Sequence, residues 1–156
     1  MKIGAILLSL AVTLPALAST YTGVKSSSPE GYRARGILMY ENKNYVGAID
    51  QLSHLYMMED GKKYVEDADF YIALSNYERG DAYCVEMFKK FIANYPASIR
   101  VPYAWAKIGD CYFFNGKYGE ALTAYAQIVP SAFNNDYKLD LTYRSAYSML
   151  KLGEFD

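Results

Sequence analysis

Residues 105–125 read WAKIGDCYFFNGKYGEALTAY and contain two apolar stretches of helical spacing joined by an Asn-Gly turn. In the first stretch, residues 105, 108, 109 and 112 recur at i, i+3, i+4 and i+7, which places their side chains on one face of an α-helix. In the second, Ala121, Tyr125 and Ile128 follow the same rule. Small residues on such faces let two backbones approach closely, so we expect a helical hairpin with close contacts at Gly109 and Ala121.

The same plan recurs along the chain with a period of 36 to 37 residues. Residues 42–49 match residues 115–122 at an offset of 73, with an Asn, a Tyr and an Ala-aliphatic pair in register. Gly80 lies 36 residues before Gly116, and Gly153 lies 37 residues after it. A period of this size is typical of repeat proteins in which each unit is one supersecondary element.

Three segments are predicted to interrupt the helices between these units. The first, 59–63, is polar and contains a glycine, and the others, 94–98 and 130–132, contain proline. Proline lacks an amide hydrogen and disfavours helix in the residue before it. At the start of the first unit, Ser28 or Pro29 is expected to begin the helix, because proline suits the first helical turn.

The third unit carries a motif in three parts: Trp105-x-x-Ile108-Gly109-x-x-Tyr112, then Gly116-x-Tyr118, then Ala121-x-x-x-Tyr125. In order and spacing these residues resemble the tetratricopeptide repeat. The first two units depart from the family pattern at Arg35 and Asp69, where aliphatic and bulky residues are usual. They keep Tyr32, Gly36, Tyr45, Ala48 and Leu52 in the first unit, and Ile72, Ala73, Gly80 and Val85 in the second.

This resemblance implies an all-α fold, a right-handed superhelical solenoid of antiparallel helix pairs. About three complete hairpins and part of a fourth are expected within a domain at 30–156, with repeats at approximately 30–60, 66–96, 102–130 and 137–156, the last one incomplete. Because the fourth repeat is incomplete, the last helix would lack a partner from its own repeat. A solenoid normally closes with a polar capping element instead. Either the sequence is a fragment or this helix is frayed, and a fragment is the preferred interpretation.

The first eighteen residues have the composition of a secretory signal peptide. Lys2 supplies a positive charge, residues 3–14 are almost wholly apolar, and Ala16-Leu17-Ala18 offers the small residues that a signal peptidase recognises. A core helix or membrane span is the weaker interpretation, because the apolar run is shorter than the roughly 20 residues that cross a bilayer. We expect cleavage after Ala18, a flexible tether at 19–29, no lipid anchor, and export to the periplasm or another extracytoplasmic space.

The composition argues against several classes of function. With 52% hydrophobic and 21% charged residues among 156, the chain is expected to form a globular domain. A formal net charge of -1 without clusters of Lys and Arg argues against nucleic-acid binding. His54 is the only histidine, and we expect it to be a surface or hydrogen-bonded residue. No enzymatic activity, metal or cofactor is predicted.

Two groups of residues allow two interpretations each. The carboxylates of Glu66, Asp67 and Asp69 are expected to stabilise a helix start through its dipole, and a calcium loop is the weaker alternative because its turn glycine is absent. Cys84 and Cys111 each lie in an apolar helical pattern and are predicted to be separate core thiols. Their pairing in an oxidising compartment is the alternative.

The resemblance also implies a binding surface, because the first helix of each hairpin in such a solenoid lines a concave groove. Alignment of the four units gives a mainly aromatic set of groove positions: Arg33, Tyr40, Phe70, Tyr77, Tyr103, Asp110, Phe113, Tyr143 and Tyr147. The chain has 17 tyrosines, and tyrosine is suited to binding because its ring packs while its hydroxyl makes hydrogen bonds. Other rings, including Tyr112, Tyr118 and Tyr125, are expected to pack one hairpin on the next.

These features predict a protein-interaction scaffold or adaptor that holds a peptide or protein segment in the groove, with Arg33 and Asp110 making polar contacts. The slightly long period and the Tyr95-Pro96-x-Ser98 junction are similar to repeats of bacterial cell-envelope proteins, so an envelope assembly is the expected setting. One alternative is an N-terminal docking or regulatory module of a larger exported protein or enzyme. Another is a carrier of a small ligand, which requires an enclosed apolar pocket.

Overall fold

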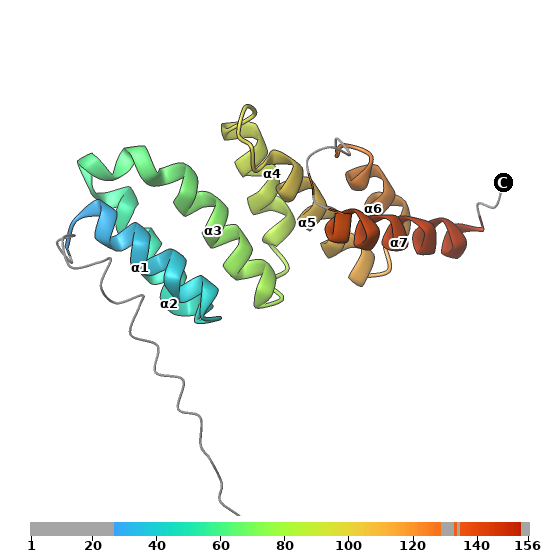
Figure 1. Ribbon diagram of the computed structural model, residues 1–156, viewed down its shortest axis with the longest axis horizontal. Helices are drawn as coiled ribbons and strands as arrows, with labels where there is room; N and C mark the ends of the chain where they lie inside the picture. The colour runs from blue at the N-terminus through green and yellow to red at the C-terminus, as the bar shows by residue number, and fades with distance from the viewer. Residues whose placement is uncertain (1–26, 129–132, 134, 154–156) are drawn as a thin grey trace, which may run out of the picture.

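The computed structural model describes residues 27–128, 133 and 135–153, and within them the chain is helical, without a strand (Figure 1). The helices are, in chain order, α1 (Pro29–Glu41), α2 (Tyr45–Ser53), the 3-10 helices η2 (His54–Met57) and η3 (Glu59–Tyr64), α3 (Val65–Glu78), α4 (Cys84–Asn94), α5 (Val101–Phe114), α6 (Tyr118–Tyr125) and α7 (Asn135–Leu152). The all-α class expected from the sequence is confirmed. Among these helices, none combines the length and apolar character that crossing a membrane requires.

Some sequence predictions fall on other parts of the chain. The signal peptide at 1–18, most of the tether at 19–29 and the break at 130–132 lie outside the described residues. The start of the first helix is described: the Ser28 side chain accepts a hydrogen bond of 3.1 Å from the amide of Gly31, and Pro29 is the first helical residue. Helix α1 therefore begins where serine and proline predicted it.

The α-helices pair into three hairpins, α1 with α2, α3 with α4 and α5 with α6, and α7 follows the third. Each turn within a hairpin has one residue of positive φ: Lys43, Gly80 and Gly116, with φ of 60°, 73° and 71°. Glycine adopts this conformation without steric cost, whereas a residue with a Cβ does not. The recurring glycines of the sequence thus mark the hairpin turns, and Lys43 occupies the equivalent place in the first hairpin at a cost in strain.

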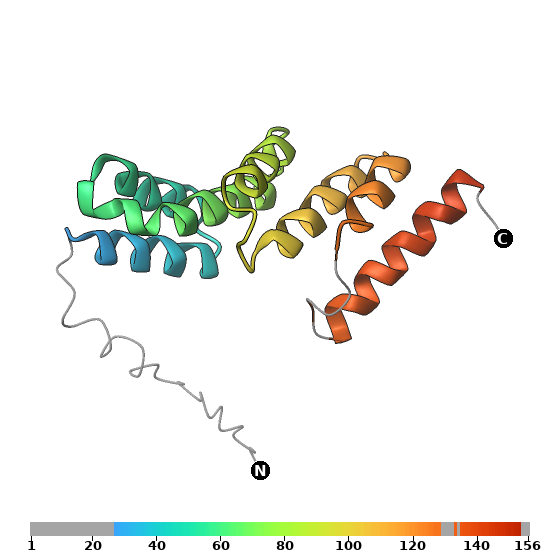
Figure 2. The same cartoon turned by 90° about the horizontal axis from the view of Figure 1, so that it is seen from above.

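The hairpins stack in chain order as a helical solenoid. Each second helix packs against the first helix of the next hairpin: α2 against α3, α4 against α5, and α6 against α7. The first helices also contact one another along the series α1, α3, α5 and α7, whereas no two second helices in the described part make comparable contact. The first helices therefore lie on the closer, inner side of the stack. Figure 2 shows the helices following one another along the long axis, with α7 at the end.

Two glycines allow the helices within a hairpin to approach closely. A Cβ added at Gly109 on α5 would overlap the ring of Tyr125 on α6, and one at Gly36 on α1 would overlap the side chain of Leu52 on α2. The two pairs are 73 residues apart, so the same contact recurs in the first and third hairpins. The predicted close contact at Gly109 is confirmed, and Ala121 of α6 is fully buried.

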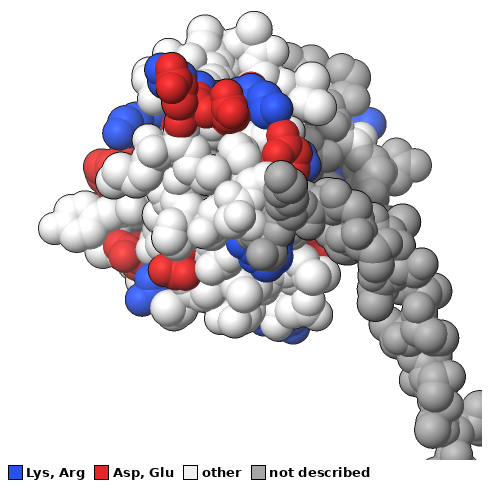
Figure 3. Space-filling view, turned by 90° about the vertical axis from the view of Figure 1, so that its left-hand side faces the viewer, with Lys and Arg blue, Asp and Glu red and all other residues white. Residues whose placement is uncertain are grey.

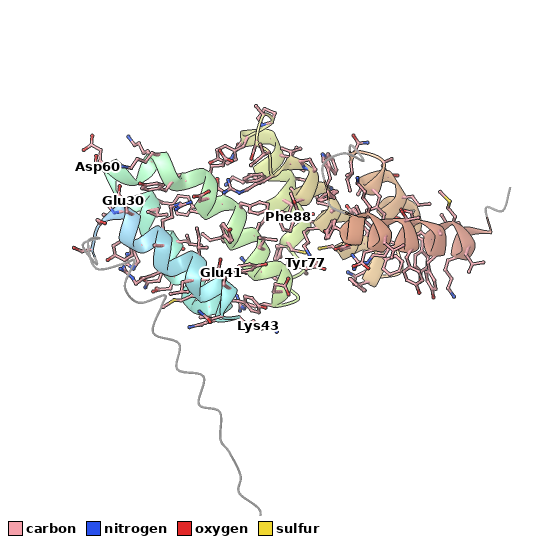
Figure 4. All side chains as sticks on the ribbon, in the orientation of Figure 1. Glu30, Glu41, Lys43, Asp60, Tyr77 and Phe88 are labelled. Carbon is pink, nitrogen blue, oxygen red and sulfur yellow. The ribbon has the colours of Figure 1, made fainter. Side chains whose placement is uncertain are left out.

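The largest hydrophobic cluster joins the second and third hairpins. Phe88 and Phe91 of α4 are its most buried large side chains, and Phe88 lies near the middle of the molecule (Figure 4). A smaller cluster joins the first hairpin to α3 and consists of Leu52, Leu55 and Ala68. Because burial of apolar surface is the main favourable term in folding, each hairpin depends on its neighbour for stability.

The connection between the first and second hairpins is itself helical. The polar segment 59–63 separates the α-helices α2 and α3, as predicted, but it belongs to the 3-10 helix η3, and Gly61 is buried against the carbonyl of Leu55. His54 begins η2, is exposed, and stacks on the ring of Tyr32 with centroids 4.5 Å apart. The connection is therefore a packed turn, and the surface position expected for the histidine is confirmed.

Candidate functional site

The nine side chains predicted to line a groove all belong to the first helices of the hairpins or to α7. They are Arg33 and Tyr40 of α1, Phe70 and Tyr77 of α3, Tyr103, Asp110 and Phe113 of α5, and Tyr143 and Tyr147 of α7. Two of them are buried, and the other seven reach the surface to different extents. Their surroundings decide which are available to a partner.

Phe70 is a core residue with only 7% of its surface exposed. Its ring packs against Phe88 and Phe91 of α4, with centroid distances of 6.4 and 5.2 Å. The prediction that Phe70 lines the groove is therefore wrong. The spacing placed it on a first helix, but the second helix of its own hairpin covers the ring.

Asp110 is also buried, with 1% exposed, and its carboxylate is bound within the chain. Its Oδ1 accepts hydrogen bonds from the Tyr125 hydroxyl at 2.9 Å and from Arg144 Nη1 at 2.5 Å, and Lys107 Nζ lies 3.8 Å from Oδ2. Burial by itself lowers the pKa of Arg144, but the charge and hydrogen bond of Asp110 raise it overall. Asp110 therefore joins α5 to α7, and the prediction that it faces a partner is corrected.

Arg33 belongs to a charge network that spans the three hairpins. Its guanidinium pairs with Asp67 at the start of α3, and the same carboxylate pairs with Nη2 of Arg100, just before α5, at 2.6 Å. Glu66 lies 3.1 Å from Nη1 of Arg100. Figure 3 shows acidic and basic side chains side by side at the end of the molecule where α1 to α3 lie. The network links successive first helices and leaves the Arg33 side chain about one third exposed.

The acidic stretch at the start of α3 bonds within the chain. Glu66 and Asp67 lie in the first turn of the helix, the position predicted for carboxylates that favour its dipole. Asp69 accepts hydrogen bonds from the hydroxyls of Tyr56 and Tyr95, at 2.5 and 2.8 Å. In the part of the chain that the structure describes, no group of three or more His, Cys, Asp or Glu side chains is placed to hold a metal ion.

An aromatic cluster connects α5, α6 and α7, and consists of Phe113, Phe114, Tyr118, Tyr143 and Tyr147. The ring of Tyr147 lies 5.6 Å from that of Phe113, 5.9 Å from that of Tyr118 and 6.2 Å from that of Tyr143. Phe114 and Tyr143 are its exposed members, at 67% and 64%. The structure thus brings together Phe113, Tyr143 and Tyr147, which the sequence had placed on one surface.

Phe114 and Tyr118 are the members of the aromatic cluster that sequence reasoning left out of the binding surface. Consecutive helical residues point in directions about 100° apart, so the pair Phe113-Phe114 cannot place both rings on one core-facing stripe. The adjacent pair of phenylalanines therefore indicated, in the sequence alone, that one of the two rings points away from the core. Tyr118 was expected to pack between hairpins, and its contacts with Phe113 and Tyr147 agree with that role.

Tyr40 of α1 and Tyr103 of α5 also belong to the predicted groove and pack on neighbouring rings. Tyr40 contacts Tyr71 of α3 edge-on at 5.4 Å, and burial, helped by nearby Glu78, raises its pKa to about 12. Tyr103 is exposed but packs edge-on against Phe133 at 4.6 Å. Each ring therefore combines a solvent-facing part with a fixed orientation.

Tyr77, toward the C-terminal end of α3 (Figure 4), borders a pocket of about 620 Å³. The pocket lies where the ends of α3 and α5 meet the start of α4, and both cysteines line it. Cys84 and Cys111 are buried free cysteines, and their sulfur atoms lie 2.6 Å apart. The structure has them as free, buried thiols, as predicted, but α4 and α5 also bring the two sulfurs into contact, which the sequence did not indicate.

A second pocket, of about 470 Å³, lies between α6 and α7. Its walls are mainly apolar and include Ile128, Phe133, Leu141 and Met149. Leu139 and Leu150 of α7 do not line this pocket and are exposed. Helix α7 therefore offers apolar surface that its contacts with α5 and α6 leave uncovered.

Comparison with protein families gives one match, a tetratricopeptide repeat model that covers residues 67–98. This chain contains a tetratricopeptide repeat. The matched residues comprise nearly all of the second hairpin, α3 and α4, whose residues kept only part of the family pattern. The tetratricopeptide resemblance drawn from the third hairpin is confirmed, because the hairpins before and after the match share its plan and stack against it. A search of curated proteins and a search of solved structures each gave no match.

Proposed function

We propose that this protein is a scaffold or adaptor of the bacterial cell envelope that binds a peptide or protein segment on aromatic side chains of its first helices and α7. The general role in protein interaction follows from the tetratricopeptide repeat, a module whose stacked hairpins offer an extended binding surface. The aromatic cluster on α5, α6 and α7 supports the more specific part of the proposal, that a peptide or protein segment binds to aromatic side chains. Enzymatic activity, a cofactor and a nucleic-acid partner are not part of the proposed function.

The aromatic cluster has the properties of a binding hot spot. Phe114 and Tyr143 expose most of their surface, and each packs on a neighbouring ring, Phe114 on Phe113 at 5.5 Å and Tyr143 on Tyr147 at 6.2 Å. Because these contacts restrict the two rings, little side-chain entropy is lost on binding. The guanidinium of Arg144 lies 5.5 Å from the ring of Phe114. Exposed rings of this kind suit a partner segment that carries apolar or aromatic side chains.

The proposed surface extends from the aromatic cluster along the inner side of the stack. Besides the cluster, it comprises Arg33, Tyr40, Tyr77 and Tyr103. These side chains lie on helices that contact one another in sequence, α1 to α3 to α5, so their order along the surface follows their order in the chain. Such an arrangement favours an extended segment over a compact ligand.

The cluster is tested by replacing Phe114 and Tyr143 together with serine. Envelope proteins are cross-linked in cells to the wild-type or the variant protein, and the captured proteins are identified by mass spectrometry. Because two exposed aromatic anchors are removed, we expect capture of the main partner to fall at least about tenfold. Circular dichroism and the melting temperature should stay near the wild-type values, since neither side chain is buried.

Tyr83→Ser is the matched control for this experiment. Tyr83 is 71% exposed, as the cluster residues are, but it lies in the turn between α3 and α4. We expect this variant to capture the partner as the wild type does. Equal capture by the wild type and the double variant would remove the aromatic cluster from the proposed surface.

The envelope setting rests on the composition of residues 1–18 and on the junction at 95–98. When the sequence from Met1 onward is expressed in a bacterium, we expect the mature chain to begin at Ser19 and to be released with the periplasmic fraction. N-terminal sequencing of the fractionated protein measures both. A chain that keeps Met1 and stays with the cytoplasmic fraction would contradict this part of the proposal.

The exposed apolar residues of α7 favour a second candidate function, a docking module within a larger exported protein or enzyme. Leu139, Leu150 and Leu152 are exposed, and in a stack of hairpins such side chains normally pack on a further helix. Reading the gene beyond the codon for Asp156 tests this candidate directly. A stop codon at that point would leave the scaffold as the better explanation.

A further inference from the structure

Cys84 and Cys111 come from different hairpins, yet their sulfur atoms lie 2.6 Å apart. Cys84 is the first residue of α4, and Cys111 lies in the last turn of α5. Both side chains belong to the cluster that packs the second hairpin on the third. The contact is therefore placed at the junction of two repeats and is held there by the surrounding core.

Cys84 and Cys111 are buried, but a pocket reaches them. Both cysteines line the pocket of about 620 Å³, together with Tyr77, Asp81, Asn115 and Lys117. The volume is within the range that accommodates a small organic molecule. A low-molecular-weight thiol or disulfide can therefore reach the sulfurs without unfolding of the core.

We propose that Cys84 and Cys111 form a reversible disulfide that locks the second hairpin to the third, and that the pocket admits the disulfide-bearing oxidant that makes it. This inference goes beyond the scaffold function and stands independently of any partner. It assigns the pocket as a site of thiol–disulfide exchange. In an oxidising compartment such bonds form and persist.

The exchange takes place in two steps. One of the two cysteines, as the thiolate, attacks one sulfur of the oxidant and forms a mixed disulfide, and the first oxidant thiolate leaves and takes up a proton. The other cysteine then loses its proton and attacks the sulfur of the first, which expels the second oxidant thiol. In total, the two cysteines lose two electrons and two protons, and the oxidant's disulfide gains them and becomes two thiols.

Either cysteine can be the first attacker. Both side chains are almost equally buried, at 6% and 8% exposed, and both line the pocket. Burial, with the hydrogen bond and charge of Cys84, raises the pKa of the Cys111 thiol above its ordinary value, whereas nearby Lys107 lowers it. Since the thiolate is the nucleophile, we expect the exchange to be faster at higher pH.

The bond closes a loop whose ends are 27 residues apart. Closing a loop of this length restricts the unfolded chain and stabilises the folded state. It also fixes α4 against α5, so the relative position of two repeats becomes dependent on the redox state.

The purified chain is first reduced and then incubated with oxidised glutathione as the probe. We expect the intact mass to fall by the two hydrogens of one disulfide, and alkylation after denaturation to add no label, against two labels on the reduced chain. The reaction rate should not depend on protein concentration, because the bond is intramolecular. The melting temperature should rise by about 10 °C.

Single and double variants separate this bond from other effects. Cys111→Ser is expected to accumulate one glutathione on Cys84 without a rise in melting temperature, because the second thiol is absent. Cys84→Ala with Cys111→Ala should show no response to the oxidant. If the wild-type chain keeps two alkylatable thiols, stops at a glutathione adduct, or forms only cross-linked dimers, the proposal is overturned.

Discussion

Gly109 is a position where a single added methyl group would disturb the packing of two helices. The ring of Tyr125, itself buried, occupies the space that a Cβ would need. We expect Gly109→Ala to lower the free energy of unfolding by about 2 kcal/mol, because a buried ring must move or α5 must shift away from α6. Urea denaturation followed by circular dichroism measures the change.

Gly119→Ala is the control for this prediction. Gly119 lies in α6, and no atom outside its own helix lies within 4 Å of a Cβ built there. Alanine is the better helix former, so this variant should be as stable as the wild type or more stable by up to about 1 kcal/mol. If both variants lose the same stability, the close contact at Gly109 does not contribute as described.

At the scale of one element, the turn between α1 and α2 contains avoidable strain. Lys43 adopts a φ of 60°, the conformation that Gly116 adopts in the third hairpin. Lys43→Gly should therefore raise the free energy of unfolding by about 1 kcal/mol, and Gly116→Ala should lower it by a similar amount. The two changes are compared by urea denaturation. Loss of stability in both would mean that the lysine side chain outweighs the strain.

The docking of α7 depends on the ion pair between buried Asp110 and partly buried Arg144. Asp110→Asn removes the charge that compensates Arg144, so we expect a loss of about 3 kcal/mol and faster amide exchange along α7. Asp140 also faces Arg144, at 3.5 Å, but is 64% exposed. Asp140→Asn should change stability by less than about 0.5 kcal/mol, and an equal effect of the two substitutions would contradict the importance of burial.

At the scale of the whole molecule, buried and partly buried tyrosines make the fold sensitive to alkali. Burial raises the pKa of Tyr40 from 10.0 to about 12, and it is also the main cause that raises the pKa of Tyr77 and Tyr125. The folded state keeps phenol protons that the unfolded chain loses above pH 10, so the free energy of unfolding falls as the pH rises through this window. Below pH 10 these groups have no such effect.

The measurement is the urea midpoint between pH 9 and 12, with tyrosinate absorbance recorded in parallel. We expect part of the tyrosine population to titrate at an ordinary pH, and the rest only together with unfolding. Titration of all tyrosines in a single step near pH 10, with the helical signal retained, would show that the rings are not buried as described.

Much of the fold was predictable from the sequence, because helices and turns depend on residues a few positions apart. The spacing around Trp105 predicted a hairpin, and the repeated glycines located its turns. The period of 36 to 37 residues then predicted stacking, since one hairpin cannot bury its own apolar face. Position 43 was harder to interpret, because a lysine stands where the other turns have glycine.

The candidate site was predictable only in part. Helical spacing assigned all nine groove residues to the correct helices, but it does not report what the neighbouring helix covers. Phe70 is buried by α4, and Asp110 forms an ion pair with Arg144, which lies 34 residues further along the chain. Phe114, which no alignment selected, is among the most exposed rings.

The sequence by itself determined the helical class, the repeat period and the places where backbones approach closely, because these follow from local geometry and side-chain size. Only the tertiary structure decided which aromatic rings reach the solvent and which charges are paired. It alone also brought Cys84 and Cys111 together from positions 27 residues apart. Such contacts depend on how one hairpin is oriented on the next, and that orientation results from the packing of many side chains at once.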